Sequence, residues 1–194
     1  LVYMVKDLIL EYGLPGSGFY LDDLDALHQA LSEAMDRREP IFLIGVSFAL
    51  LDFAEQYALR LPAEAVVMET GGMKGRRKEM VRAELHAHLK AGLGVSAIHS
   101  EYGMTELLSQ AYAVGDRFHC PPWMRVHITD LYVPGKLLPP GQRGRLCITD
   151  LANVESCAFI ATDDVGIQHE DGSFEVLGRM DHAALRGCNL LYES

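Results

Sequence analysis

The 194-residue sequence predicts an α/β protein in which a parallel sheet flanked by helices is followed by a smaller β-rich lobe. Helix-like and strand-like segments alternate through the first 115 residues, and short strand-like runs separated by turns fill the remainder. Hydrophobic residues make up 49% of the chain and charged residues 23%, which is typical of a globular protein. We therefore expect two domains, residues 1–115 and residues 116–194.

In the first predicted domain, three helices alternate with three strands. The first helix spaces its leucines at helical intervals behind two aspartates that suit a helix start. Ser47 is available to cap the second helix, and Gly92 to end the third. Such alternation implies a parallel sheet, and ligands of these sheets bind beyond the carboxyl ends of the strands. In chain order, the predicted segments are helix 22–38, strand 40–46, helix 47–61, strand 63–72, helix 76–92 and strand 94–103.

The second predicted domain contains only strand-like runs. Proline and glycine set turns in "PGKLLPPGQ" and "HEDGS", which separate these runs. The predicted strands are 124–133, 143–151, 157–162 and 173–179.

Charge and hydropathy exclude several classes of protein. Lys and Arg total 17 against 27 Asp and Glu, so the net charge of −10 argues against a nucleic-acid partner, which requires a basic surface. No apolar run approaches the roughly 18 residues of a membrane span. No signal peptide opens the chain, so a cytoplasmic location is expected. The start "LVYMV", in mid-pattern, suggests a fragment.

The metal-binding and disulfide patterns of cysteine and histidine are missing from the sequence. Its four cysteines, Cys120, Cys147, Cys157 and Cys188, include no CxxC pair, which favours reduced thiols over a zinc site or a disulfide framework. The "HAH" histidines lie two apart on a predicted helix, unlike the spacing of HExxH.

The strongest functional pattern is "YGMTE" at residues 102–106, at the end of a predicted strand. Tyr102 offers an aromatic face, Thr105 a hydroxyl for phosphate, and Glu106 the hard carboxylate oxygen that Mg²⁺ prefers. Gly103 would let a nucleotide approach the backbone closely. The structural alternative is that Tyr102 and Glu106 cap a helix beginning near Met104.

Three spaced motifs, "YGMTE", "ATDDVG" at 161–166 and "GRMDHAALRGCNL" at 178–190, resemble the adenylate-forming (acyl-CoA synthetase-like) superfamily. Further text, including "VYMVKD", "LIGVSFALLDF", "ETGGMKGRRKE" and "LRGCNL", resembles the LuxE-like acyl-protein synthetases over nearly the whole chain. The resemblance implies a partial adenylate-forming fold with ATP and Mg²⁺ as cofactors.

The resemblance also implies roles for individual residues. In the YGMTE segment, Tyr102 would stack on adenine, Thr105 would contact the α-phosphate and Glu106 would help to hold Mg²⁺, with Gly103 and Met104 also lining the nucleotide. A backbone wall beside the purine would come from Thr70, Gly71 and Gly72. The neighbouring basic run "KGRRK" could attract phosphate or simply face water.

The same resemblance assigns the ribose to Asp164 and a second ribose or phosphate contact to Arg179. A carboxylate suits the ribose because it can accept hydrogen bonds from both vicinal hydroxyls. Asp163 is the weaker match. The structural alternatives are an aspartate in a turn between strands and an arginine in a surface salt bridge.

Cys188, in "RGCNL", matches the segment whose cysteine takes the acyl group as a thioester in acyl-protein synthetases. Neighbouring Arg186 could lower the pKa of its thiol, although a free cysteine is often a small buried hydrophobe. Two expected parts of the superfamily are missing from the sequence: the upstream phosphate loop, and the C-terminal domain that carries a catalytic lysine. The missing lysine disfavours thioester formation with CoA relative to self-acylation.

The implied activity is activation of a carboxylic acid, with a fatty acid as the expected substrate, to an acyl-adenylate. The acyl group would then pass to a protein cysteine and onward to a reductase or carrier. The alternatives are an inactive nucleotide-binding scaffold and an acyl-CoA or aryl-CoA ligase. A more remote alternative is a serine esterase, because "GVSFA" approximates a nucleophile elbow around Ser47.

Overall fold

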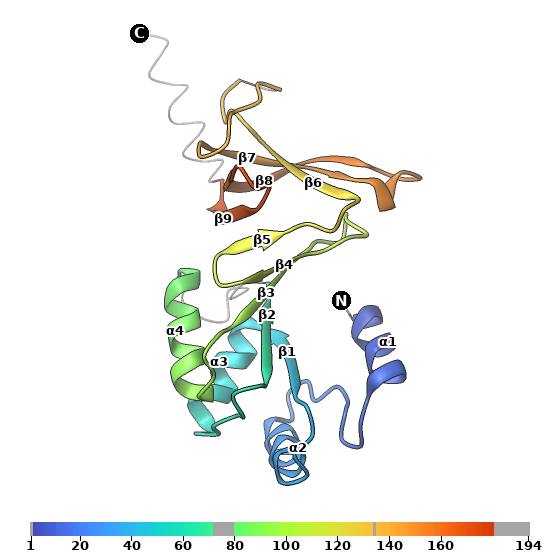
Figure 1. The fold of residues 1–194 in the computed structure, drawn as a ribbon, viewed down its shortest axis with the longest axis vertical. Helices are drawn as coiled ribbons and strands as arrows, with labels where there is room; N and C mark the ends of the chain where they lie inside the picture. The colour runs from blue at the N-terminus through green and yellow to red at the C-terminus, as the bar shows by residue number, and fades with distance from the viewer. Residues whose placement is uncertain (1, 72–79, 134, 181–194) are drawn as a thin grey trace. The chain divides into compact units, whose positions relative to one another are not determined.

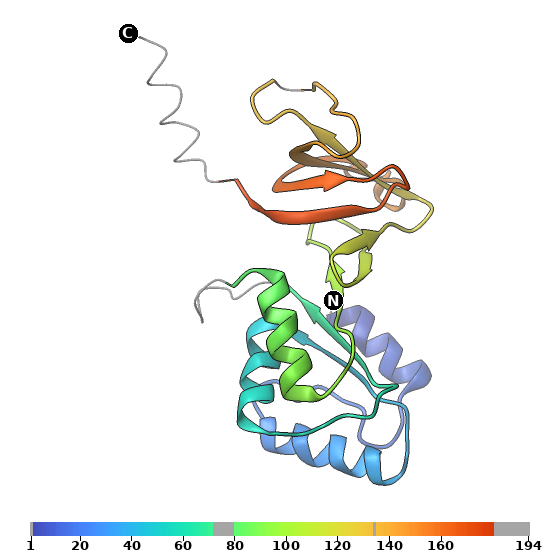
Figure 2. The same cartoon turned by 60° about the vertical axis from the view of Figure 1, so that its left-hand side comes forward.

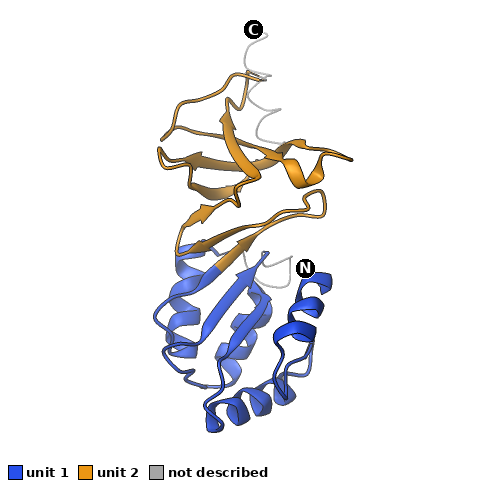
Figure 3. Ribbon diagram, turned by 45° about the vertical axis from the view of Figure 1, so that its right-hand side comes forward, with its two compact units in different colours: residues 1–99 blue, residues 100–194 orange. Residues whose placement is uncertain are grey.

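The structure is a computed structural model that describes residues 2–71, 80–133 and 135–180. The chain divides into two compact units, residues 1–99 and residues 100–194 (Figure 3). This division comes earlier than the expected domain boundary after residue 115, because strand β4 (Ala111–Val114) pairs with β5 (Arg117–His119) inside the second unit. The division into domains 1–115 and 116–194 stays a prediction.

The first unit is built from helices and parallel strands, as the alternating sequence pattern predicts. Its helices are α1 (Val2–Tyr12), α2 (Leu24–Asp36), α3 (Ser47–Gln56) and α4 (Arg82–Leu93), and its strands are β1 (Phe42–Val46) and β2 (Val66–Thr70) (Figure 1). Strands β1 and β2 pair in parallel, so their carboxyl ends lie at the same edge. Helices α3 and α4 lie side by side next to these strands (Figure 2).

Close packing of α3 and α4 depends on a small residue. A Cβ atom added to Gly92 would lie 2.8 Å from the Cβ of Ala54, closer than side chains normally approach. Around this contact, Phe53, Leu89 and Leu93 are fully or almost fully buried. The absence of a side chain at Gly92 therefore allows α4 to pack closely against Ala54 of α3.

The helix ends differ in detail from the prediction. Ser47 is the first residue of α3 and makes no capping hydrogen bond, so the expected cap is wrong. Helix α4 ends at Leu93, and Gly94, with a φ of +73°, provides the left-handed cap that was expected of Gly92. The helix begins at Arg82, because the backbone of Val81 is extended and not helical.

The second unit is an antiparallel sheet in the order β4-β5-β9-β8-β7-β6. Strand β3 (His99–Tyr102) leads into it, and the remaining elements are β6 (Met124–Thr129), β7 (Arg143–Asp150), a 3-10 turn η1 (Leu151–Asn153), β8 (Phe159–Gln168) and β9 (Phe174–Arg179). The predicted β-rich lobe is confirmed. Phe118, Leu146 and Phe174 are completely buried at its centre.

Strand β8 is longer than predicted. The expected strand stopped at Thr162, whereas β8 continues to Gln168 and therefore contains Asp164. The alternative that Asp164 is a turn residue between strands is wrong, because Asp164 pairs with Arg179 of β9 in the ladder. Across the described ranges, no helix combines the length and the apolar character that a membrane span requires.

Candidate functional site

The second unit brings three of the predicted site residues into direct contact. The Tyr102 hydroxyl donates a hydrogen bond of 2.7 Å to Oδ2 of Asp164, and Nε of Arg179 lies 3.3 Å from Oδ1 of the same carboxylate. Tyr102 ends β3, Asp164 lies in β8 and Arg179 ends β9. Residues up to 77 positions apart in the sequence thus meet around one carboxylate.

The strand register explains the ion pair. Asp164 and Arg179 are directly opposite each other in the antiparallel β8/β9 ladder, and the register shifts just beyond them, between Val165 and Gly166. Such bulges redirect side chains and occur often beside functional sites. The hydroxyl of Thr162 also accepts a hydrogen bond of 3.0 Å from the Asp164 backbone N–H, which fixes the strand just before the site.

The Tyr102 ring is held by aromatic packing. Its centroid lies 5.7 Å from that of Phe118 and 5.5 Å from that of Phe174, in tilted and edge-on geometries that favour attraction. Only 8% of the residue is exposed. Burial, the Asp164 charge and the hydrogen bond to that carboxylate all raise the pKa of Tyr102, so the phenol stays protonated and remains a donor.

Asp164 retains acceptor capacity despite its two partners. Its side chain is 13% exposed, and an ionised carboxylate offers about four acceptor positions, of which Tyr102 and Arg179 use two. Arg179 is 77% exposed, so its guanidinium reaches solvent beside a carboxylate that is mostly buried. The surface salt bridge expected as an alternative is present.

Thr105 and Glu106 lie in an exposed turn directly after Tyr102. Leu107 N–H donates 3.1 Å to the Met104 carbonyl, which closes this turn, and the helix considered as an alternative is absent. Both side chains are exposed. Within the described part of the chain, no hydrogen bond or ion pair joins the Glu106 carboxylate to the Tyr102–Asp164–Arg179 cluster, so the Mg²⁺-binding role of Glu106 stays a prediction.

Gly103 lies close to the side chains of Glu101 and Gln110. A Cβ atom there would lie 2.4 Å from Oε1 of Glu101 and 3.1 Å from Cγ of Gln110. The motif and the segment that follows it therefore fold back closely on one another.

Two buried polar residues that hold this segment were not predicted from the sequence. Asp150, fully buried at the end of β7, accepts hydrogen bonds from the backbone of Leu108 and Ser109, and Asn153 donates to the Glu106 carbonyl at 2.6 Å. The available signal was the string "TDLAN" after a predicted strand, a place where Asp and Asn commonly satisfy loop backbone.

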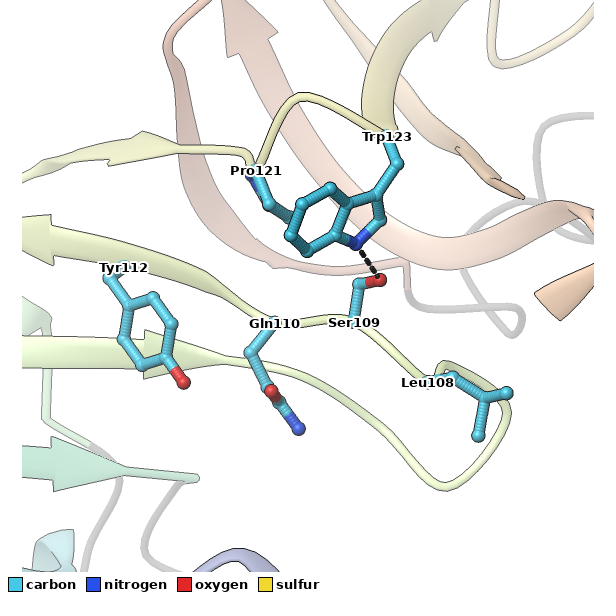
Figure 4. Close-up of a pocket in the computed structure, with 6 residues that line it drawn as sticks. All are labelled: Leu108, Ser109, Gln110, Tyr112, Pro121 and Trp123. Carbon is cyan, nitrogen blue, oxygen red and sulfur yellow. Dashed lines mark hydrogen bonds between the residues drawn. The ribbon is translucent and has the colours of Figure 1, made fainter. Parts of the chain in front are cut away.

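A shallow pocket of about 260 Å³ lies beside the same segment (Figure 4). Its wall includes the indole of Trp123, whose Nε1 donates 2.9 Å to Oγ of Ser109. The lining residues are Leu108, Ser109, Gln110, Tyr112, Pro121 and Trp123.

Thr70 and Gly71 lie in the first unit, at the carboxyl end of β2. Gly71 has a φ of +72°, a conformation that glycine adopts readily, and its carbonyl lies 2.9 Å from Oγ of Ser47. The position agrees with the rule for parallel sheets, but the purine-wall role of Thr70 and Gly71 stays a prediction. Gly72, the rest of the "TGG" motif, is outside the described residues.

Ser47 is arranged differently from an esterase nucleophile. It is 1% exposed, and its Oγ lies 2.9 Å from Oε2 of Glu69, while His86 lies 3.6 Å from the other oxygen of that carboxylate. A serine nucleophile requires a base within hydrogen-bond reach and an exposed oxygen. Here a carboxylate lies next to the hydroxyl in place of an imidazole, which disfavours the esterase hypothesis.

The remaining predicted site residue, Cys188, is outside the described residues, as are Arg186 and the "KGRRK" run. Of the described cysteines, Cys157 is exposed, and burial raises the pKa of Cys120 to about 11.

Hard oxygen ligands for Mg²⁺ are available in the YGMTE turn. No group of three or more His, Cys, Asp or Glu side chains that could hold a metal occurs among the described residues. Mg²⁺ in nucleotide enzymes is commonly bound by one or two carboxylates together with phosphate oxygens and water. The exposed Glu106 carboxylate fits this mode.

Comparison with known proteins shows both a family and a fold. The family model "Acyl-protein synthetase, LuxE" matches residues 19–194. Among solved structures, ATP-bound MatB from Rhodopseudomonas palustris superposes with a TM-score of 0.65 at 20% identity, covering 92% of this chain and 37% of that one. O-succinylbenzoate Coenzyme A Synthetase (MenE) from Bacillus subtilis, in complex with ATP and magnesium ion, gives 0.54 at 17% identity, covering 92% and 45%. A search of curated proteins found no match.

These neighbours confirm the predicted partial adenylate-forming fold. The chain spans less than half the length of either neighbour. The family match extends across both compact units, from residue 19 to the last residue. The chain therefore belongs to the LuxE family of acyl-protein synthetases.

Proposed function

We propose that this chain is part of an enzyme that uses ATP and Mg²⁺ to activate a fatty acid as an acyl-adenylate and then transfers the acyl group to its own Cys188. The observation that carries the proposal is the contact of Tyr102 and Arg179 with the Asp164 carboxylate. All three residues were selected for nucleotide binding from separate sequence motifs. Family membership supports the same reaction class.

The first proposed step forms the adenylate. A carboxylate oxygen of the acid attacks the α-phosphorus of ATP, and the bond to the β-phosphate breaks and releases pyrophosphate. Asp164 accepts hydrogen bonds from the ribose hydroxyls with its remaining lone pairs. Arg179 and Thr105 offer a positive charge and a hydroxyl to the phosphate. Tyr102, whose ring is mostly buried, holds the Asp164 carboxylate in place through its hydroxyl. Such fixed donors stabilise the charge that develops in the transition state.

Bound Mg²⁺, held by Glu106 together with phosphate oxygens, would supply charge neutralisation in this step. One exposed carboxylate suits that task better than a cluster of acids would, because the phosphates provide the other ligands.

The second proposed step forms the thioester. The thiolate of Cys188 attacks the acyl carbonyl carbon, the carbon–oxygen bond to AMP breaks, and AMP leaves. A reductase or an acyl carrier would then accept the acyl group. This step is supported by the family match and by the position of Cys188 in "RGCNL".

The adenylation step is tested by ATP–pyrophosphate exchange on the full-length protein with a panel of straight-chain and aromatic acids. We expect exchange that depends on a fatty acid and falls by about 10²-fold or more in Glu106→Gln, since removing one transition-state contact typically costs that much. Glu170→Gln is the matched control, because Glu170 is also an exposed glutamate of the second unit but lies in the β8–β9 turn. Exchange that is flat across the panel contradicts the proposal.

A further inference from the structure

The segment that carries Glu106 has little regular structure of its own. Between the end of β3 at Tyr102 and the start of β4 at Ala111, it contains one turn. A loop of this kind keeps a defined position only if other groups bind its backbone. The position of the Glu106 carboxylate therefore depends on the residues that contact this loop.

Asp150 is the main anchor of the loop. Its Oδ2 accepts from Leu108 N at 3.1 Å and from Ser109 N at 3.0 Å, and its Oδ1 accepts from Ser109 Oγ at 2.7 Å and from Ala152 N at 3.1 Å. The residue is completely buried. Burying a carboxylate is costly unless donors surround it, and four donors meet that requirement here.

Asn153, three residues later, holds the loop at Glu106 itself. Its Nδ2 donates 2.6 Å to the Glu106 carbonyl and 3.0 Å to the Cys157 carbonyl, and its Oδ1 accepts from the Ser156 hydroxyl. Only 5% of Asn153 is exposed. The side chain thus joins the Glu106 backbone to the 153–157 turn.

The pocket wall is part of the same network. Trp123 donates from its indole to Ser109 Oγ, which in turn donates to Asp150, and the Trp123 carbonyl accepts from Leu151 N at 3.0 Å. The loop is thereby bound by the last residue of β7, by η1 and by the residue before β6.

We infer that Asp150 and Asn153 are positioning residues, which hold the 104–110 loop so that Glu106 presents its carboxylate to Mg²⁺. The anchoring of the loop stands by itself, whereas the presentation of Glu106 to Mg²⁺ rests on the proposed function. Residues that orient a metal ligand typically change metal affinity or activity by about 10–100-fold when they are altered.

The first test measures the loop directly on the full-length protein, by residue-resolved amide hydrogen exchange. In Asp150→Asn, an NH₂ group can replace the carboxylate oxygen that accepts hydrogen bonds from the Leu108 and Ser109 N–H groups, and these N–H groups then lose their acceptor. We therefore expect the Leu108 and Ser109 amide hydrogens to exchange at least about tenfold faster than in the wild type. Asp130→Asn is the matched control. Asp130 accepts from Tyr132 N and Val133 N in another loop of the same unit, so its variant should leave the 104–110 amides unchanged.

The second test measures the Mg²⁺ concentration that gives half-maximal acid-dependent exchange. We expect it to rise about tenfold or more in Asp150→Asn and in Asn153→Ala, and to stay at the wild-type value in Asp130→Asn. Adding Asp150→Asn to Glu106→Gln should produce little further change, because the anchor acts through that carboxylate. Asn153→Ala keeps the test decisive if Asp150→Asn does not fold.

The outcomes separate the inference from the function it rests on. Leu108 and Ser109 amides that stay protected in Asp150→Asn overturn the inference alone. The inference is also overturned if Asp150→Asn and Asn153→Ala need the same Mg²⁺ concentration as the wild type for half-maximal exchange. A wild-type protein without acid-dependent exchange overturns the proposed function, and the assignment of Glu106 to Mg²⁺ with it.

Discussion

Asp164 shows how one residue can be identified from sequence and yet have surroundings that sequence does not reveal. The string "ATDDVG" and the chemistry of a ribose pointed to its carboxylate. The donors it already has, the Tyr102 hydroxyl and the Arg179 guanidinium, come from β3 and β9, and only the strand register brings them together. Asp150 and Asn153 were not predicted because the loop to which they hydrogen-bond lies more than 40 residues earlier in the sequence.

Replacing Tyr102 by Phe tests the hydrogen bond to Asp164. We expect the free energy of unfolding to fall by about 1 kcal/mol at pH 8, since one hydrogen bond is lost. The folded pKa of Tyr102 is raised, so above pH of about 10, the ordinary tyrosine value, the unfolded chain releases this proton while the folded chain keeps it. The contribution is therefore complete below pH 10 and shrinks as pH rises further.

Urea denaturation at pH 8 and pH 10.5 measures this effect, with Tyr132→Phe as the control because Tyr132 is 68% exposed. The stability gap between wild type and Tyr102→Phe should narrow at the higher pH, and Tyr132→Phe should show no such narrowing. A gap that widens with pH would show that the phenol is not held in its protonated form.

Cys188 is the predicted acyl acceptor, and its replacement by Ser should abolish protein labelling by a radioactive fatty acid and ATP. The label on wild type should be released by neutral hydroxylamine, as a thioester is. Cys157→Ser is the control, since Cys157 is the exposed thiol among the described cysteines. Label that survives in Cys188→Ser, or acyl transfer that requires free CoA, contradicts the transfer step.

At the scale of elements, segments with strong periodicity were predicted and short or irregular ones were not. The leucine spacing of α2 and the apolar runs of β1, β6 and β7 identify these elements without tertiary information. Strands β4 and β5 have four and three residues, too few for a period-2 pattern to be distinctive. Helix α1 was not predicted, although its half-buried residues Met4, Val5, Leu8 and Ile9 recur at helical spacing.

The paired strands β8 and β9 depend on Gly166, two residues after Asp164. A Cβ atom at this position would lie 2.1 Å from the Glu175 carbonyl oxygen and 2.4 Å from Cδ1 of Leu146. Backbone cannot move aside as a flexible side chain can, so we expect Gly166→Ala to lower the free energy of unfolding by about 3 kcal/mol or more. Urea denaturation measures the loss.

Gly18→Ala is the control for this change, because nothing lies within 4 Å of the added Cβ and the residue has no positive φ. It should leave stability nearly unchanged or slightly raised. Equal stability of Gly166→Ala and Gly18→Ala would mean that the β8/β9 contact is not as close as described.

For the whole molecule, the fold class followed from the order of patterns along the chain. Alternating helices and strands gave the first unit, and strand runs separated by Pro and Gly gave the second, although the units divide after His99 instead of near residue 115. The expected boundary was placed where the strand runs separated by turns begin, and it stays a prediction. A match at 20% identity shows how little of the sequence is needed to keep this fold.

The central claim is that the Tyr102–Asp164–Arg179 cluster binds the adenosine part of an acyl-adenylate. The most direct measurement is calorimetric binding of a stable fatty acylsulfamoyl-adenosine to full-length protein, compared between wild type and Asp164→Ala, with Asp130→Ala as the control for losing a loop aspartate. We expect tight binding to wild type and to the control, and affinity at least about tenfold weaker in Asp164→Ala, which loses two ribose hydrogen bonds to a charged acceptor. Equal affinity of wild type and Asp164→Ala, or no binding to wild type, would contradict the account.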